Sequence, residues 1–247
     1  ISAAQKGGYE TFMMKEIKEQ PDAIRKTLSP RINDDNTITL DGISLTDEDI
    51  RGFNRIFITA CGSAYHVGVV GKYVIEELAR IPVEVDVASE FRYRYPIVDD
   101  KTLVILISQS GETADTLEAL RESKKKGART LSVVNVVGSS IASESDDVLY
   151  TWAGPEIAVA TTKAYSTQLT LIYLLAIRFA LAHKTITDTI AYDLVDEIKR
   201  IPEKIEKVFE SEEYIERLAE RYTYLSDAYF IGRNTDYALA LEASLKL

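Results

Sequence analysis

The sequence predicts an α/β protein with a doubly wound, five-stranded parallel sheet that is flanked by helices. Two observations predict it. Between Arg55 and His183, five short apolar and β-prone runs alternate with segments of helical periodicity. One of these runs, Leu103–Ile107, consists only of leucine, valine and isoleucine, which is typical of a strand covered on both faces. Parallel strands joined by right-handed helical crossovers form such a sheet, and we expect the strand order 2-1-3-4-5.

Residues 1–54 are expected to form a helical lead-in and linker that packs against the sheet domain. Thr46 is expected to cap a short helix there, because three acidic residues follow it in the first helical turn. The elements expected before this cap are helices at Thr11–Gln20 and Asp22–Leu28 and a small strand at Thr37–Leu40.

Residues 55–184 are expected to form the sheet domain. Its strands are expected at Ile56–Thr59, Val83–Val87, Leu103–Ile107, Leu131–Val137 and Val148–Trp152. Helices are expected at Val67–Arg80, Thr113–Lys126, Ser139–Glu144 and Thr161–His183, with Gly127 ending the second of them. The last helix holds the most apolar run, which Arg178 interrupts. We expect this run to be too short to span a bilayer and to form a buried core helix.

Residues 185–247 are expected to form a helical connection and the truncated start of a second, related α/β unit. The expected elements are helices at Ile190–Phe209, broken at Pro202, and at Glu212–Tyr222, a strand at Ala228–Ile231, and a helix from Tyr237. Strand, glycine-containing loop and helix repeat the order that begins the sheet domain. Because an apolar helical stripe continues to Leu247 without a cap, we expect the chain to be a fragment.

Composition limits the classes of function. The formal net charge of −10 disfavours a nucleic-acid surface and an anionic membrane, so neither is expected as a partner. A single cysteine, Cys61, allows no intrachain disulfide and indicates a reducing, cytoplasmic location. The two histidines, His66 and His183, lie far apart and lack the neighbours that a zinc site needs, so we expect no metal and give neither histidine a role.

The loop after the third strand has the chemistry of a phosphate site. Three hydroxyls and one carboxamide lie within six residues, where the first N–H groups of a helix lack intrahelical partners. Gly111 lets the backbone approach a ligand closely, and the loop matches neither a Walker A sequence nor Gly-x-Gly-x-x-Gly. The alternative is that Ser110 only caps the helix. The candidate phosphate-binding residues in this loop are Ser108, Gln109, Ser110 and Thr113.

Two further loops are expected at the same edge of the sheet. In the order 2-1-3-4-5, the first and third strands are neighbours at the topological switch point, where ligands bind beyond the carboxyl ends of the strands. The loop after the last strand also reaches this edge, and its small residues leave room for a sugar. The candidate residues in the two loops are Cys61, Gly62 and Ser63, and Val159, Ala160 and Thr161.

Some of these residues have a second interpretation. Cys61 could be a nucleophile, but no neighbour in the sequence would activate it, and a buried cysteine is usually inert. Thr161 could be the N-cap of the following helix, which is compatible with a binding role. An arginine of the segment Ser89–Arg94 could pair with phosphate, although packing against a partner subunit is the alternative that we favour.

Together these motifs resemble the sugar isomerase (SIS) family, and more narrowly the isomerase half of the glutamine–fructose-6-phosphate aminotransferases. The similarity runs over nearly the whole chain. The segments that carry it are Lys15–Ile17 with Glu19–Pro21, Ala60–Ser63, Ser89–Tyr93, Ser108–Thr116, Glu156–Ile157 with Val159–Ala164, and Leu241–Leu247.

The resemblance implies an SIS-type fold and an enzyme that converts fructose 6-phosphate and glutamine into glucosamine 6-phosphate and glutamate, without a cofactor. It implies a hexose 6-phosphate ligand, a glutaminase domain and the rest of a second SIS domain outside this chain, and a homodimer. Lys246 matches a catalytic lysine beside the reacting carbons. By residue match, phosphate is held by Ser63, Ser108, Gln109, Ser110 and Thr113, and the sugar is lined by Cys61, Gly62, Val159, Ala160 and Thr161.

The chain departs from the family pattern in three ways. Ser63-Ala64 stands where Thr-Ser is usual, which removes one hydroxyl, and Thr161 stands where Ser is common. The family's general base, ring-opening histidine and Schiff-base lysine have no counterparts. We therefore expect this chain to bind a hexose phosphate without turning it over. Two rivals stay open: a non-catalytic sugar-phosphate sensor, and another isomerase or deglycase of the same fold.

Overall fold

The computed structural model describes residues 5–247, so residues 1–4 of the predicted lead-in lie outside the described residues. Five parallel strands form a sheet with the order β2-β1-β3-β4-β5, which confirms the predicted fold class and strand order. The central register places Ile58 of β1 beside Val85 of β2 and Ile105 of β3. The strands are β1 (Arg55–Ala60), β2 (Val83–Val87), β3 (Thr102–Ser108), β4 (Arg129–Val134) and β5 (Asp147–Tyr150).

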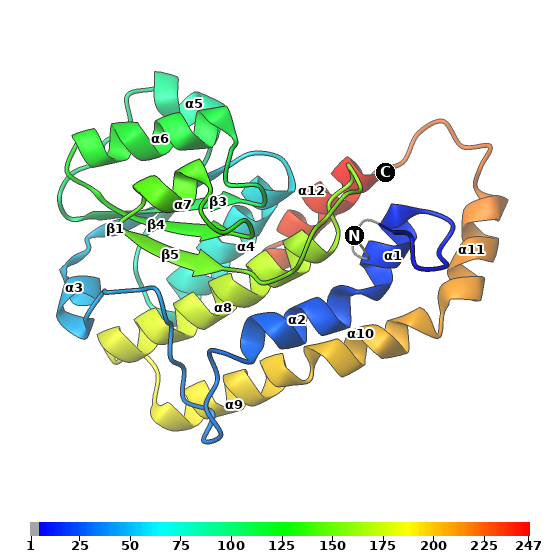
Figure 1. Cartoon of the computed structure of the whole chain (residues 1–247), viewed down its shortest axis with the longest axis horizontal. Coiled ribbons are helices and arrows are strands. Elements are labelled where there is room, and N and C mark those ends of the chain that lie inside the picture. Colours follow the sequence, from blue (N-terminus) through cyan, green and yellow to red (C-terminus); the bar gives the residue numbers. More distant parts are fainter. Residues whose placement is uncertain (1–4) are drawn as a thin grey trace.

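Helices cover both faces of the sheet, as Figure 1 shows. Alternate side chains serve the two layers: Ile58 and Ile105 pack with α4 and α8, whereas Phe57 and Leu106 pack on the opposite face. All seven residues of β3 are buried, as predicted for a strand covered on both sides. The covering helices are α4 (Ser63–Leu78) and α8 (Lys163–His183) on one face, and α5 (Ala88–Tyr93), α6 (Ala114–Lys125) and α7 (Ser140–Glu144) on the other.

The lead-in forms α1 (Phe12–Lys18), α2 (Gln20–Leu28) and α3 (Asp47–Gly52). Figure 1 shows α2 lying between α8 and α10. Thr46 caps α3 in a full capping box with Asp49, which confirms the predicted cap. The strand predicted at Thr37–Leu40 is wrong: the segment makes one antiparallel bridge, between Ile32 and Ile38, and no further strand lies beside it to extend the ladder.

The C-terminal quarter is helical and consists of α9 (Asp188–Lys199), α10 (Ile201–Phe209), α11 (Glu212–Arg221) and α12 (Thr235–Lys246). The predicted break at Pro202 is confirmed, because α10 starts anew with this proline in its first turn. The strand predicted at Ala228–Ile231 is wrong. Tyr229 and Ile231 are more than 90% exposed, and the described chain offers no neighbouring strand to pair with. Helix α12, which follows this segment, packs against α4.

Helix α8 is the central helix of the core. The expectation of a span that is too short concerned the apolar run Leu169–Ala182, whereas the whole helix, with 21 residues, is long and apolar enough to cross a membrane by length and composition alone. However, 67% of that stretch is buried inside the protein. The expectation of a buried core helix is therefore confirmed.

Candidate functional site

A cavity of about 490 Å³ opens at the carboxyl edge of the sheet. Its walls come from the loops after β1, β3 and β5 and from helices α8 and α12. The structure brings all eleven predicted site residues to this one cavity: Cys61, Gly62, Ser63, Ser108, Gln109, Ser110, Thr113, Val159, Ala160, Thr161 and Lys246. The sequence analysis missed four lining residues, which are Ala64, Ile107, Gln168 and Leu245.

The loop after β3 is held in a tight turn by its own hydroxyls. Ser108 Oγ lies 2.9 Å from Thr113 Oγ1 and accepts a hydrogen bond of 3.1 Å from the N–H of Gly111. Gly111 has φ +68°, and a Cβ at this position would lie 2.0 Å from Ser139 Oγ. Only glycine fits there, because the backbone passes directly against the side chain of Ser139.

The amino-terminal end of α6 opens on the cavity through its N-cap residue, Thr113. In the described chain no side chain caps this helix, so the alternative that Ser110 serves only as a cap is wrong. Ser110 Oγ instead accepts from the N–H of Glu112 at 3.2 Å, within the loop. The first N–H groups of α6 therefore lack a side-chain partner, which is the arrangement that favours an anion.

Glu112 lies within this loop but does not line the cavity. Its carboxylate accepts hydrogen bonds from the hydroxyl and N–H of Ser140, at 2.7 and 2.8 Å. These bonds hold the pKa of Glu112 below its ordinary value. The negative charge is thus fixed on α7, away from the place where a phosphate would enter.

The loop after β5 is held by carboxylates rather than by hydroxyls. Glu16 of α1, which is 2% exposed, accepts from the N–H groups of Ile157 and Ala158 at 2.6 and 3.2 Å. Glu156 accepts from the N–H groups of Thr162 and Ala164 at 2.9 and 3.1 Å.

These contacts correct the prediction that Thr161 is the N-cap of the long helix. Thr162 occupies the N-cap position. A charged acceptor, Glu156, displaces the neutral hydroxyl because hydrogen bonds to an ionised group are stronger. Thr161 is left free to line the cavity.

Glu156 is expected to make the free energy of unfolding depend on pH. Burial raises the pKa of Glu156 above its ordinary value of about 4.3, although hydrogen bonds from Thr162 and Ala164 oppose the rise. The protonated form is therefore favoured by folding, so this contribution to stability is fully present below the unfolded pKa and is lost as the pH rises through the folded pKa. Denaturation series at several pH values would measure the free energy of unfolding of the wild type and of Glu156→Gln. The wild-type value minus the variant value is expected to fall as the pH rises from the unfolded pKa through the folded pKa of Glu156. A difference that does not change with pH would contradict the raised pKa of Glu156.

Lys246 reaches the cavity from α12. Its Nζ lies 2.9 Å from Ser63 Oγ and 3.1 Å from Glu242 Oε1. Glu242 Oε2 in turn lies 2.6 Å from Nδ1 of His66 on α4. No sequence pattern predicts the pairing of His66 with Glu242, because 176 residues separate them.

The remaining titratable groups offer little chemistry at this place. Among residues 5–247, Cys61 and Lys246 are the only titratable side chains that line the cavity, so none of these residues places a histidine or carboxylate there to activate the thiol. The interpretation in which an arginine of Ser89–Arg94 pairs with phosphate is also wrong. Arg94 instead binds Asp86 and Glu84 of β2, and neither Arg92 nor Arg94 lines the cavity.

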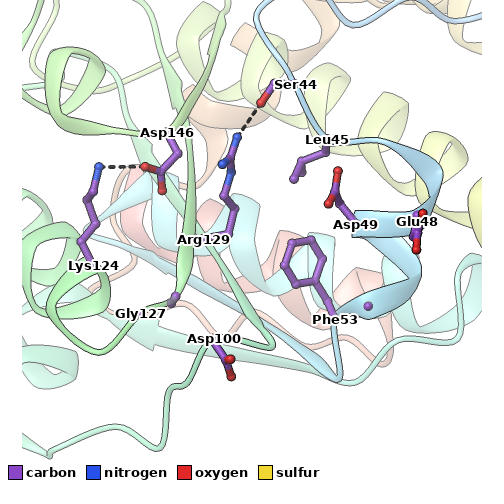
Figure 2. Close-up of a pocket in the computed structure, with 12 residues that line it drawn as sticks. Ser44, Leu45, Glu48, Asp49, Phe53, Asp100, Lys124, Gly127, Arg129 and Asp146 are labelled. Atoms are coloured by element: carbon purple, nitrogen blue, oxygen red, sulfur yellow. Dashed lines mark hydrogen bonds and ion pairs between the residues drawn. The ribbon is translucent and has the colours of Figure 1, made fainter.

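A second, open cavity of about 630 Å³ lies at the amino edge of the sheet (Figure 2). Its basic groups are already paired: Arg129 binds Asp147 and Ser44, and Lys124 binds Asp146. Because the paired charges leave acidic side chains in excess around it, this cavity does not suit an anion. Among residues 5–247, no group of three or more His, Cys, Asp or Glu side chains could hold a metal ion.

The sequence profile of the SIS domain matches residues 49–178, which is more than half of the chain. The chain belongs to the SIS domain family. The matched residues of this SIS chain include the five strands and the loops after β1, β3 and β5.

Curated relatives of this SIS chain cover it from end to end. It is 57% identical over its whole length to a glutamine–fructose-6-phosphate aminotransferase (isomerizing) of Caldanaerobacter subterraneus subsp. tengcongensis, and 58% identical over 99% of its length to that of Clostridium tetani. It spans 41% and 40% of the length of these two relatives.

A solved structure agrees. The C-terminal domain of glucosamine-fructose-6-phosphate aminotransferase from Francisella tularensis matches 99% of this chain with a TM-score of 0.94 and 39% identity, over 68% of that domain's own chain. The SIS chain therefore corresponds in sequence and fold to the isomerase half of these aminotransferases.

Proposed function

We propose that this SIS chain binds a hexose 6-phosphate, as the sugar-binding part of a glutamine–fructose-6-phosphate aminotransferase. The whole protein would convert fructose 6-phosphate and glutamine into glucosamine 6-phosphate and glutamate. A glutaminase domain would supply the ammonia, and we expect a cytoplasmic homodimer that includes the remainder of a second SIS domain.

The observation that carries the proposal is the uncapped start of α6 beside a ring of hydroxyls. Ser108, Ser110 and Thr113 bring three hydroxyls to the cavity, and the helix dipole adds a partial positive charge. Phosphate oxygens accept hydrogen bonds from such groups without needing a lysine. In the proposal, Gln109 and Ser63 complete the phosphate contacts. The sugar lies against Cys61, Gly62, Val159, Ala160 and Thr161, with Lys246 beside it.

Chemistry beyond binding needs a group that moves a proton between C1 and C2 of the opened sugar. In the part of the chain that the structure describes, the cavity is lined by one cationic side chain, Lys246, and by no carboxylate or imidazole. Lys246 could polarise an oxygen on the sugar, but proton abstraction from carbon calls for a base within hydrogen-bonding reach. We therefore expect the 247 residues on their own to bind the sugar phosphate and not to interconvert fructose and glucose 6-phosphates.

Thermal unfolding with added ligands tests the proposal. Fructose 6-phosphate and glucose 6-phosphate should raise the melting temperature, because a ligand present at 100 times its Kd stabilises the native state by about 2.7 kcal/mol. AMP should not, since the loop lacks a nucleotide-binding motif. If neither hexose phosphate shifts the transition, the proposed function is wrong. Interconversion of the two sugars by the purified chain would contradict only the expected lack of turnover.

A further inference from the structure

Two helices meet in a ladder of four polar side chains beside the cavity. Helix α4 contributes Ser63 and His66, which lie one turn apart, and α12 contributes Glu242 and Lys246, also one turn apart. The contacts run from His66 to Glu242 at 2.6 Å, from Glu242 to Lys246 at 3.1 Å, and from Lys246 to Ser63 at 2.9 Å. Each member is therefore tied to the next.

We propose that Glu242 is a positioning residue that holds the Lys246 ammonium against the sugar and keeps it from turning onto the phosphate. This inference rests on the proposed function, because it assigns the Lys246 side of the cavity to the sugar and the loop of residues 108–113 to the phosphate. It adds two residues, Glu242 and His66, that do not line the cavity themselves.

The burial of Glu242 gives the restraint its strength. Its side chain is 9% exposed, whereas that of Lys246 is 25% exposed, so the carboxylate is the fixed end of the pair. A buried carboxylate is costly unless it is paired. Glu242 Oε2 is hydrogen-bonded to the imidazole of His66, and Oε1, which has no hydrogen-bond partner in the described chain, is held by its ion pair with the ammonium of Lys246. An imidazole nitrogen 2.6 Å from a carboxylate oxygen carries a proton, so His66 donates from Nδ1. His66 thereby fixes Glu242 to α4, and Glu242 fixes Lys246.

Without the pairing to Glu242, the Lys246 ammonium would pair with the phosphate rather than with the sugar. Ser63, which Lys246 already contacts, is one of the proposed phosphate ligands. A lysine ammonium on its flexible stem would move toward a dianionic phosphate one hydrogen bond away. The carboxylate 3.1 Å from Nζ competes for that charge, so Lys246 stays directed at the sugar.

The consequence is selectivity for a sugar phosphate over free phosphate. In Glu242→Gln the shape of the side chain is kept and the competing charge is lost. We expect the affinity for inorganic phosphate to rise by about 3- to 10-fold, because the Lys246 ammonium becomes free to pair with it. The ratio of affinities for fructose 6-phosphate and inorganic phosphate should fall by at least the same factor.

The experiment is isothermal titration of the full 247-residue chain with inorganic phosphate and with fructose 6-phosphate. The variants are Glu242→Gln, Glu242→Gln with Lys246→Met, and His66→Asn. The gain in phosphate affinity should vanish in the double variant, because Glu242 acts through Lys246. His66→Asn should give a smaller gain in the same direction. Glu213→Gln, which breaks an exposed pair with Arg217 on α11, is the matched control and should change neither affinity.

A role limited to packing would lower both affinities or leave both unchanged, and either result overturns the inference. So does a phosphate gain that persists without Lys246. Thermal unfolding of each variant shows whether it is folded. If Glu242→Gln does not fold, the affinities of His66→Asn test the inference instead. Failure of the wild type to bind fructose 6-phosphate would overturn the proposed function together with this inference. Normal binding by the wild type with an unchanged ratio in Glu242→Gln would overturn the inference alone.

Discussion

Replacing both Ser110 and Thr113 by alanine is expected to lower the affinity for fructose 6-phosphate by about 100-fold or more while the chain stays folded. Each substitution removes a hydroxyl that would donate to a charged phosphate oxygen, and such hydrogen bonds contribute about 1.5–3 kcal/mol each. The fold should persist, because Ser110 makes only a local bond to the N–H of Glu112, and Thr113 bonds to Ser108 within the same loop. Isothermal titration measures the affinity, and thermal unfolding measures the fold.

The control for this double variant is Ser143→Ala, which removes an exposed hydroxyl on α7 outside the cavity. Its affinity should match that of the wild type. An unchanged affinity in the double variant would contradict the phosphate assignment for the loop after β3, and with it the main support for the proposed function.

Glu16→Ala is expected to destabilise the chain by about 3 kcal/mol and to weaken sugar-phosphate binding by about 10-fold or more. The substitution leaves the N–H groups of Ile157 and Ala158 without their charged acceptor and frees the loop that carries Val159, Ala160 and Thr161 into the cavity. The binding loss follows from the added cost of ordering this loop around the ligand. Urea denaturation gives the free energy of unfolding, and titration with fructose 6-phosphate gives the affinity.

Two further variants make this test specific. Glu16→Gln keeps one acceptor oxygen and should recover about half of the lost stability. Glu10→Ala removes an exposed carboxylate two residues before α1 and should leave both quantities unchanged. Wild-type stability in Glu16→Ala would mean that the two N–H groups find other partners and that the lead-in does not hold the loop.

The sheet could be predicted from the sequence because its signals are local. Each strand lies in a short run of β-prone residues, and in β3 that run is unbroken and apolar. Gly127, with φ +87°, follows the end of α6 at the position predicted from the sequence. The two wrong strands, at Thr37–Leu40 and Ala228–Ile231, have β-prone residues but no neighbouring strand in the described chain, and the first makes only the single bridge between Ile32 and Ile38. Propensity alone does not make a strand, because a strand is stabilised by its pairing partner.

The candidate site was predictable to the extent that topology determines it. A sheet of order 2-1-3-4-5 brings the loops after its first and third strands together, so residues far apart in the chain could be assigned to one cavity. Gln168 was missed because it lies within α8, whose apolar sequence predicts a buried core helix. Glu16, Glu242 and His66 were missed because their partners lie between 141 and 176 residues away, and no periodic pattern reports such contacts.

The hydrogen bond from Ile157 to Glu16 joins residues 141 positions apart, and the ladder from α4 to α12 joins positions 176 apart. Contacts of such large sequence separation carry a high loop-closure entropy, so they form late in folding. The central strands can pair as soon as residues 55–134 are available, whereas the rim of the cavity needs segments from both ends of the chain. The ligand site is therefore expected to become ordered only after the sheet that carries it has formed.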